Sequence, residues 1–230
     1  RFFCRIIFEL RKLMSKLTEI NCKEIFRNAY ENRYTWSEDF NGYEGECVLS
    51  IDNTFHRGKF CVGKDFKPVV QKINNENIVK IISSQLFEVC IHRVKRDFQT
   101  IHSNNDFKFV KDTEDGIEIR VSGKNNGDKY RVKDKSINMV YRKIHGSIIE
   151  IFVQSFLDTG VGLLSRKYTS QQIDPVTLVA NSPKLEYEDQ FINVDDKRIW
   201  LLHSRTIKYL NKNQEEKTQR FIFEDLSLLK

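Results

Sequence analysis

The chain has 230 residues, of which 40% are hydrophobic, 12% aromatic and 30% charged, and only three are proline. This composition is typical of a folded protein with a substantial core and argues against a disordered chain. No apolar run is long enough to span a bilayer, the formal net charge is +6, and the five cysteines form no Cys-x-x-Cys pair, so we expect buried reduced thiols and no zinc site.

The first predicted element is a basic amphipathic helix over residues 1–17. Its apolar residues, three or four positions apart as on one face of a helix, are Phe3, Ile7, Leu10, Met14 and Leu17. Five basic residues against one acidic residue give this segment a net charge of +4, which leaves only +2 for the rest of the chain. The helix can dock on a partner or on its own body, lie on an anionic membrane, or be a leftover targeting segment that ends before Met14. Residues 18–230 are expected to form one domain.

A second helix is predicted from about Cys22 to Arg33, because Asn21 fits an N-cap and Glu24 follows it at the spacing of a capping box. The aromatic stretch that follows contains Trp36, Phe40 and Tyr43, which are spaced as in a loop. It should connect this helix to a sheet. Large aromatic side chains dominate protein cores, so the more common role of this stretch is to close one end of the sheet. The alternative is a ligand cage. Its candidate ligand-binding residues are Tyr34, Trp36, Phe40 and Tyr43.

After the aromatic stretch the hydrophobic period changes to two, which predicts a β-meander whose third strand Pro68 favours at a sheet edge. The longest helix follows from about Asn74 to Val94, where apolar residues recur at helical spacing. Arg93, Lys95 and Arg96 at its end complement the helix dipole, and a phosphate site is the second interpretation of this basic cluster.

The remainder of the chain is predicted to consist of consecutive strands separated by turns rich in Gly, Asn and Asp. Consecutive hairpins of this length imply an antiparallel sheet that curls, with the long helix over its open side. The predicted fold is therefore α+β, a single curved antiparallel β-sheet or half-barrel with two packed helices and the N-terminal amphipathic helix. Strands are expected over residues 46–52, 54–62, 66–70, 107–111, 116–122, 129–133, 136–144, 147–157, 163–171, 177–180, 184–194, 198–211 and 218–225.

Three parts of the chain carry a resemblance to one known family. They are Asn28 to Glu46 with its Arg33-Tyr34-Thr35-Trp36 core, Asp97-Phe98 to Phe107, and Leu157-Asp158-Thr159-Gly160. They resemble a family of cyanobacterial and algal-plastid proteins known only as a domain of unknown function, from about Ile20 to the C-terminus. The resemblance implies a setting in the plastid stroma, at the stromal face of the thylakoid. It supplies no catalytic residue, and the predicted layout is similar to that of periplasmic lipoprotein carriers at the level of the fold alone.

Sequence motifs give little support to an enzyme. Asp158-Thr159-Gly160 is the tripeptide of aspartic proteases, but the chain has one copy, and a hairpin turn explains the same residues. The five histidines show no metal-ligand spacing, and no Gly-rich phosphate loop or nucleophile elbow is present. We therefore expect no catalytic residue, cofactor or metal, and an enzyme with a dispersed site is the last-ranked alternative.

Residues 124–143 combine seven basic residues with two aspartates and two interleaved tyrosines. Such strands can face an acidic partner, an anionic membrane or RNA, or form the solvated outer face of a sheet. The weakly charged body argues against nucleic acid. An acidic counterpart is formed by Glu186, Glu188, Asp189, Asp195 and Asp196. The candidate partner-binding residues are Phe3, Arg5, Ile7, Leu10, Arg11, Lys129, Arg131, Lys133 and Arg142.

Two functions are expected, in this order. The first is a non-catalytic adaptor or scaffold of the photosynthetic apparatus, docked on a stromal-side thylakoid complex such as the phycobilisome or a photosystem, with peripheral membrane contact through the N-terminal helix. The second is a carrier or chaperone that binds a lipid or pigment in a half-barrel cavity, because ligand sites tend to be concave and largely apolar.

Overall fold

The computed structural model describes residues 22–144, 146–194 and 199–230. These residues form an α+β fold with one 12-stranded antiparallel open sheet. The strand order is β3-β2-β1-β12-β11-β10-β9-β8-β7-β6-β5-β4, so every neighbouring pair except β1 and β12 is also consecutive along the chain. The prediction of one antiparallel sheet in an α+β fold is confirmed. The amphipathic helix expected over residues 1–17 lies outside the described residues.

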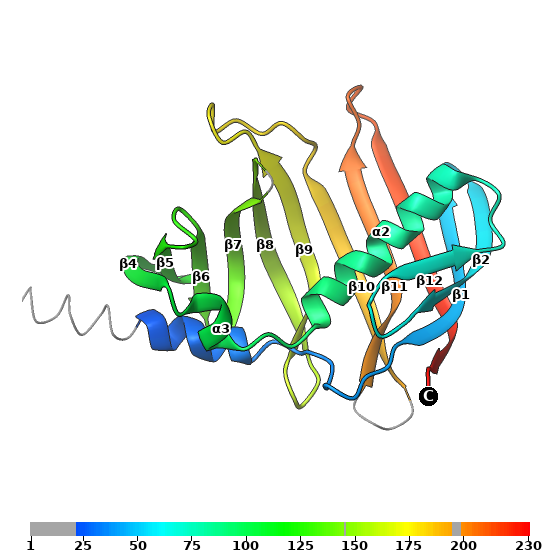
Figure 1. Cartoon of the computed structure of the whole chain (residues 1–230). Helices are drawn as coiled ribbons and strands as arrows, with labels where there is room; N and C mark the ends of the chain where they lie inside the picture. Colours follow the sequence, from blue (N-terminus) through cyan, green and yellow to red (C-terminus); the bar gives the residue numbers. More distant parts are fainter. Residues whose placement is uncertain (1–21, 145, 195–198) are drawn as a thin grey trace, which may run out of the picture. The chain divides into compact units, whose positions relative to one another are not determined.

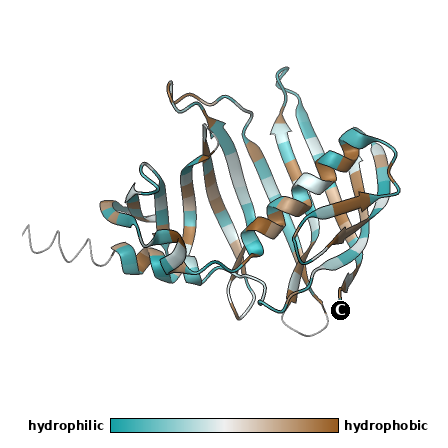
Figure 2. Ribbon diagram, viewed as in Figure 1, coloured by the Kyte–Doolittle hydropathy of each residue, from teal (hydrophilic) through white to brown (hydrophobic). Residues whose placement is uncertain are grey.

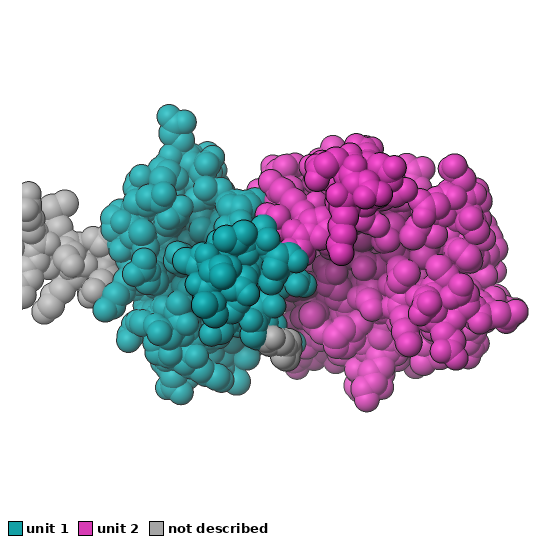
Figure 3. Space-filling view, turned by 90° about the horizontal axis from the view of Figure 1, so that it is seen from above, with its two compact units in different colours: residues 1–33, 96–152, 172–181 teal, residues 34–95, 153–171, 182–230 magenta. Residues whose placement is uncertain are grey.

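The described residues fall into two compact units, coloured teal and magenta in Figure 3. Unit 1 contains residues 22–33, 96–152 without 145, and 172–181. Unit 2 contains residues 34–95, 153–171, and 182–230 without 195–198. Each unit has its own strands and its own buried core. The expectation of one domain over residues 18–230 stays a prediction.

Unit 2 is built around α2 (Glu76–Arg93), which runs across the strands of this unit in Figure 1. The helix begins after Asn75, whose side chain accepts hydrogen bonds from the backbone N–H groups of Asn77 and Ile78. Its buried stripe recurs at helical spacing and consists of Ile78, Ile82, Leu86, Val89 and Cys90. The strands of this unit are β1 (Tyr43–Ile51), β2 (Thr54–Val62), β3 (Pro68–Gln71), the second half of β8 (Ser147–Asp158), most of β9 (Leu163–Ile173), β10 (Leu185–Val194), β11 (Ile199–Leu210) and β12 (Glu216–Leu228).

The predictions for unit 2 are confirmed in outline. The long helix was expected from about Asn74 to Val94, and Pro68 begins β3, which is the edge strand of the sheet as predicted. Hydrophobic and hydrophilic residues are interleaved along the strands in Figure 2, as expected for a sheet with two different faces. None of the described helices has both the length and the apolar character that a membrane crossing requires.

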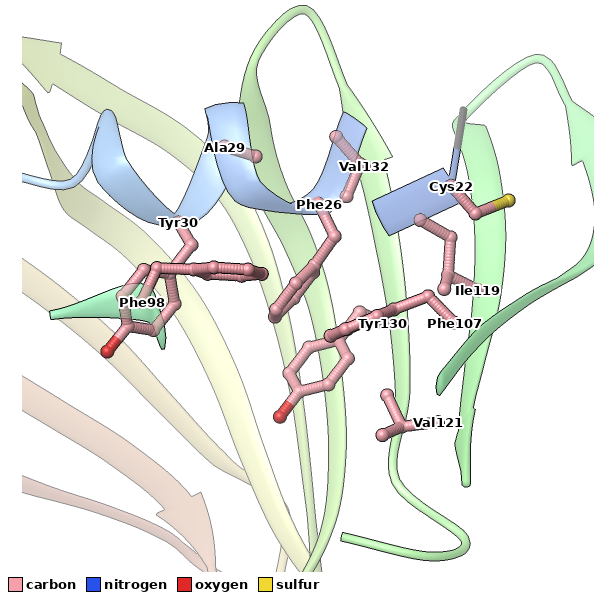
Figure 4. Close-up of a cluster of buried hydrophobic side chains, with 10 residues drawn as sticks. All are labelled: Cys22, Phe26, Ala29, Tyr30, Phe98, Phe107, Ile119, Val121, Tyr130 and Val132. Atoms are coloured by element: carbon pink, nitrogen blue, oxygen red, sulfur yellow. The ribbon is translucent and has the colours of Figure 1, made fainter. Parts of the chain in front are cut away.

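Unit 1 packs two helices against strands through aromatic side chains (Figure 4). One helix covers residues 22–31, close to the predicted range, and the other is α3 (Phe98–His102), which was not predicted. Five residues are too few to show a helical period, although Asp97 accepts a hydrogen bond from the Thr100 N–H as an N-cap. The strands are β4 (Asn105–Thr113), β5 (Gly116–Gly123), β6 (Lys129–Lys133), β7 (Ser136–Ile144) and the first half of β8 (Ser147–Asp158).

One predicted strand is wrong. Residues 177–180 lie in the connection between β9 and β10 and make only an isolated bridge between Ile173 and Ala180. The Asp174 carboxylate accepts hydrogen bonds from the backbone N–H groups of Val176 and Thr177 at 2.9 and 2.8 Å. These local bonds hold the chain in a turn and compete with pairing to a neighbouring strand.

Candidate functional site

Helix α2 lies over a sheet face that carries charged side chains. On β10, Tyr187 and Asp189 are buried, whereas Glu186 and Glu188 are exposed, because successive side chains of a strand point to opposite faces. The sequence grouping of Asp189 with an outward acidic set is therefore wrong. Asp189 follows Tyr187 by two residues, so its carboxylate lies on the same face of the strand as the Tyr187 ring.

Arg205 on β11 binds this carboxylate and connects it to α2. The two residues are opposite each other in the strand pair, and both side chains are buried, at 3% and 2% exposure. Arg205 Nε and Nη2 donate to Asp189 Oδ1 and Oδ2 at 2.8 and 2.7 Å, a bidentate arrangement. Nη2 also donates to the Tyr168 hydroxyl at 2.8 Å, and Nη1 donates to Gln85 Oε1 on α2 at 2.9 Å and lies 3.4 Å from Glu88 Oε2. We call these five residues the Arg205 cluster.

Arg205 stays positively charged despite its burial. Burial lowers the pKa of Arg205, but Tyr168, Asp189 and Glu88 outweigh it and raise this pKa well above its ordinary value. Burial also raises the pKa of the Tyr168 hydroxyl, which keeps it neutral. The rings of Tyr168 and Tyr187 stack at 4.6 Å between centroids and 6° between planes, and Arg205 Cζ lies 5.3 Å from the Tyr187 ring. The result is one rigid, charged layer beneath the helix.

Arg93 places a second guanidinium at the C-terminal end of α2. Its backbone carbonyl accepts a hydrogen bond from the Trp36 N–H at 2.8 Å, and its Cζ lies 5.5 Å from the Phe191 ring. Its half-buried side chain makes no hydrogen bond or ion pair with any described residue. Burial lowers the pKa of Arg93 to about 10, with Asp189 acting against burial and Arg205 acting with it. In the predicted basic cluster at the helix end, Arg93 alone is partly buried, since Lys95 and Arg96 are exposed.

The four aromatic residues proposed as ligand-binding are buried, and the rings of Trp36, Phe40 and Tyr43 pack on one another. Trp36 stacks on Phe40 at 4.3 Å and meets Tyr43 edge-on at 5.9 Å. The Tyr34 hydroxyl accepts a hydrogen bond from the Trp200 N–H at 2.8 Å. They form the packed corner that was the first interpretation of this stretch. Their role toward a ligand stays a prediction.

Tyr43 differs from the other members of this corner because its hydroxyl has no hydrogen-bond partner among the described residues. The side chain is completely buried, and burial raises the pKa of Tyr43 well above its ordinary value. Cys90 raises this pKa further, whereas Arg93 and Arg205 lower it, so the hydroxyl lies within electrostatic reach of both arginines. An unsatisfied hydroxyl in a protein interior costs free energy, which makes the position unusual for a core residue.

The structure places the predicted basic strand residues of unit 1 in contacts within the unit. Arg142 Nε donates to Asp128 Oδ2 at 3.0 Å, and Arg131 Nε donates to Asn138 Oδ1 at 3.0 Å. Lys129 Nζ lies 4.8 Å from the Tyr141 ring, and Lys133 Nζ donates to the Glu114 carbonyl at 2.8 Å. Their contribution to partner binding stays a prediction. Phe3, Arg5, Ile7, Leu10 and Arg11 lie outside the described residues.

The Asp158-Thr159-Gly160 tripeptide is the turn between β8 and β9. The Asp158 carboxylate accepts a hydrogen bond from the Gly160 N–H at 2.8 Å, and Thr159 Oγ1 donates to the Gly162 carbonyl at 2.7 Å. Gly160 has a φ of +79°, a conformation that favours glycine. The hairpin interpretation accounts for these residues. In the described part of the chain no three His, Cys, Asp or Glu side chains gather closely enough to hold a metal ion.

The Arg205 cluster was not found from the sequence. Its members lie far apart along the chain, on α2, β9, β10 and β11, and they meet only after the strands pair. A weaker signal was available, because Arg205 shares strand parity with the apolar Ile207, and Asp189 shares parity with Tyr187. A charged residue at an inward strand position is rare unless it is paired.

Residues 17–229 match the family described as Protein of unknown function (DUF3386). The expected resemblance to a domain of unknown function over most of the chain is confirmed. No curated protein matches the chain.

Two solved structures are similar to the chain over most of their length. One is a DUF1329 family protein from Desulfovibrio piger, with 10% identity, coverage of 91% of this chain and 92% of that chain, and a TM-score of 0.30. The other is the LolA superfamily protein NE2245 from Nitrosomonas europaea, with 8% identity, coverage of 91% and 94%, and a TM-score of 0.33. Both TM-scores are low, so neither similarity supports a conclusion about the site.

Proposed function

The chain belongs to the DUF3386 family, and we propose that it is a non-catalytic carrier or chaperone that binds a lipid or pigment between α2 and the sheet of unit 2. The observation that carries this proposal is the polar attachment of the helix. Arg205 Nη1 on β11 donates a hydrogen bond to Gln85 Oε1 of α2 at 2.9 Å and lies 3.4 Å from Glu88 Oε2. These polar contacts join α2, the proposed cover, to the sheet. In an ordinary core, apolar side chains would pack at this point.

Stability alone does not explain such a cluster. Replacing a buried ion pair by well-packed apolar residues is often neutral or stabilising, so a buried charged layer is weak support for a purely structural role. Water or a polar group of a ligand can replace the helix contacts of Arg205 one at a time. A helix attached in this way can lift from the sheet and close again.

The helix surface and the sheet surface that would separate when α2 lifts are suited to an amphipathic molecule. The buried stripe of α2 is mostly aliphatic. The connection before β1 adds the buried Trp36 and Phe40 rings, and β11 adds the buried Arg205. Small-molecule sites commonly combine a mostly apolar lining with a few placed polar groups. An acyl chain or a pigment ring would take the place of helix side chains when the cover lifts.

Binding of a fluorescent fatty acid, cis-parinaric acid, to the full chain tests this proposal. We expect saturable binding by the wild type and faster probe release from Gln85→Ala, because that substitution removes the neutral contact between α2 and Arg205. Ser84→Ala is the matched control, since Ser84 is the exposed neighbour on the same helix and bonds only to the Lys80 carbonyl. No probe binding by the wild type, or equal release from all three proteins, would contradict a carrier with α2 as its cover.

A second candidate function is the adaptor of the photosynthetic apparatus, and a specific loop favours it. The connection between β9 and β10 in unit 1 exposes Val176, Leu178 and Val179 by 87%, 65% and 63%. Asp174 holds this loop in a fixed turn, so the three aliphatic side chains are presented together to solvent. Contiguous exposed apolar side chains commonly mark interaction sites.

The setting of this second candidate comes from the resemblance to cyanobacterial and algal-plastid proteins. It supports a place in the plastid stroma at the stromal face of the thylakoid, with a phycobilisome or photosystem complex as partner and the N-terminal helix as a peripheral membrane contact. Crosslinking and affinity purification from thylakoids would test it. We expect co-purification of one such complex with the wild type and its loss from Val176→Ser/Leu178→Ser. Sedimentation of the wild type as a single uncomplexed protein after gentle lysis would contradict it.

A further inference from the structure

Two polar groups near the C-terminal end of α2 lack the partners that their burial calls for. The Tyr43 hydroxyl is completely buried and unpaired among the described residues. Arg93 as a residue is half-buried, and no hydrogen bond or ion pair joins its side chain to another described residue. Nearly all buried polar groups in proteins are hydrogen-bonded, and an exception commonly marks a missing water or ion.

Trp36 contacts both residues, and the charge of Arg93 acts on the Tyr43 hydroxyl. The Trp36 N–H donates to the Arg93 carbonyl at 2.8 Å, and the Trp36 ring meets the Tyr43 ring edge-on at 5.9 Å between centroids. Arg93 Cζ also lies 5.5 Å from the ring of Phe191, on β10. The unpaired cation and the unpaired hydroxyl therefore share an aromatic surrounding at the C-terminal end of α2.

No described carboxylate forms an ion pair with Arg93, although Asp189 acts on it electrostatically. The carboxylate of Asp189 is held in a bidentate contact by Arg205, and Glu88 also lies against Arg205, at 3.4 Å. Arg205 in turn uses Nε, Nη1 and Nη2 on described partners, so it has little capacity for a further ligand. A water molecule can satisfy the Tyr43 hydroxyl, but it cannot compensate the charge of Arg93. An anion can do both.

We propose that Arg93 and the Tyr43 hydroxyl bind an oxyanion, a carboxylate or a phosphate group. The planar fork of arginine matches both groups through two parallel N–H bonds, and the tyrosine hydroxyl donates a third. The surrounding rings fit the apolar part that such a group carries in an amphipathic molecule. The inference deepens the proposed carrier function, on which it rests for the lipid or pigment, by naming the polar end of the molecule as anionic.

Titration of the full chain, followed by the fluorescence of its two tryptophans, tests this site. The probes are octanoate, inorganic phosphate, and methyl octanoate as the uncharged match to octanoate. We expect octanoate and phosphate to bind the wild type, and methyl octanoate to bind much more weakly. Arg93→Gln should weaken octanoate binding by about 10-fold to 100-fold, the range of a hydrogen bond to a charged group. Tyr43→Phe should weaken it by about 3-fold to 10-fold, as one hydrogen bond is lost.

Lys95→Gln is the matched control because it removes an equal charge from an exposed residue two positions along the chain. Its octanoate affinity should equal that of the wild type, which separates a specific contact from general attraction by positive charge. Thermal unfolding of each variant shows that it is folded. No octanoate or phosphate binding by the wild type, or equal binding by Arg93→Gln, would overturn the site.

The site and the carrier function can fail separately. If phosphate and octanoate bind through Arg93 but cis-parinaric acid does not bind, the oxyanion site stands and the carrier of a long apolar molecule falls. If cis-parinaric acid and its methyl ester bind equally, and Arg93→Gln leaves both affinities unchanged, the carrier stands and the oxyanion site falls.

Discussion

The two units cover their strands with helices in different ways. In unit 1 the helix over residues 22–31 buries an aromatic cluster in which the Phe26 ring lies 4.9 Å from Phe107 and 4.5 Å from Tyr130 (Figure 4). In unit 2 the longer α2 buries an aliphatic stripe, but the sheet beneath it carries the Arg205 cluster and the unpaired Tyr43 hydroxyl. A close-packed aromatic core needs no further partner, whereas the polar layer of unit 2 is incomplete.

The buried carboxylates of the two units show the same difference. Asp128 in unit 1 accepts hydrogen bonds from the Tyr130 hydroxyl, Arg142 Nε and the Lys143 N–H, and the Arg142 side chain is 41% exposed to water. Asp189 in unit 2 is paired with an arginine that is itself buried. Unit 1 therefore satisfies its buried carboxylate with a partly exposed arginine, whereas unit 2 satisfies its own with a buried one.

The largest expected effect comes from removing one half of the buried pair. Arg205→Met should lower the free energy of unfolding by about 3–5 kcal/mol, because Asp189 is left buried and unpaired. The double variant Arg205→Met/Asp189→Leu should recover most of this loss, since it leaves no isolated charge. Urea unfolding followed by circular dichroism measures both.

The exposed pair on the adjoining positions is the control for this prediction. Lys167 and Glu188 lie 3.2 Å apart on β9 and β10, next to Tyr168 and Asp189 but on the other face. Lys167→Met should change the free energy of unfolding by at most about 1 kcal/mol. A loss from Arg205→Met no larger than that of Lys167→Met would contradict the structural weight given to the Arg205 cluster.

Acid should act on unit 1 through His102. This imidazole is buried against the aromatic cluster, where burial, followed by the charges of Arg142, Arg33 and Lys124, lowers its pKa to about 4 from about 6.5. The unfolded chain therefore binds a proton at a higher pH than the folded chain. The stabilisation is fully present above pH 6.5 and is lost as the pH falls toward 4, by about 3 kcal/mol over the whole window.

Unfolding measured at pH 7 and pH 4.5 tests this second prediction. His102→Gln should show a smaller difference between the two pH values than the wild type, because it no longer takes up the proton. His56→Gln is the control, since His56 lies on β2 of unit 2 and is less buried. An unchanged pH dependence in His102→Gln would show that other groups determine the acid sensitivity.

The smallest expected effect on stability comes from Tyr43→Phe. This substitution distinguishes a hydroxyl that serves a binding site from one that is bonded within the core. Tyr43→Phe removes a hydroxyl that has no described partner, so the free energy of unfolding should stay equal or rise by up to about 1 kcal/mol. The removal of a hydroxyl that is bonded inside the protein would instead destabilise it by about 1 kcal/mol or more. Differential scanning calorimetry of the ligand-free protein measures the change. A clear loss of stability would mean that the Tyr43 hydroxyl has a structural partner.

Much of the sheet was predictable because the patterns that specify its strands and turns involve residues close together in the sequence. β6 and β7 have the bounds that alternation and turn residues predicted, and α2 lies within the predicted range because its apolar residues recur over several turns. Two local errors have physical causes. The five residues of α3 are too few to show a period, and the Asp174 turn removes residues 177–180 from the ladder.

The candidate site was less predictable because its contacts are not local. The aromatic stretch was identified as either a packed corner or a ligand cage, and its composition cannot distinguish these two roles. Gln85 and Arg205 are far apart along the chain and meet because α2 crosses β11, which no local pattern specifies. The lack of a partner at Tyr43 depends on every neighbouring residue and appears only in the folded chain.

Native mass spectrometry of the full chain purified without detergent, wild type beside Arg93→Gln, tests most directly whether the polar layer beneath α2 is a binding site. We predict that the wild type carries an added mass that organic extraction identifies as an amphipathic carboxylate or phosphate, and that Arg93→Gln carries little or none of it. The same added mass on both proteins, or none on the wild type, would contradict the assignment of this layer to an anionic ligand.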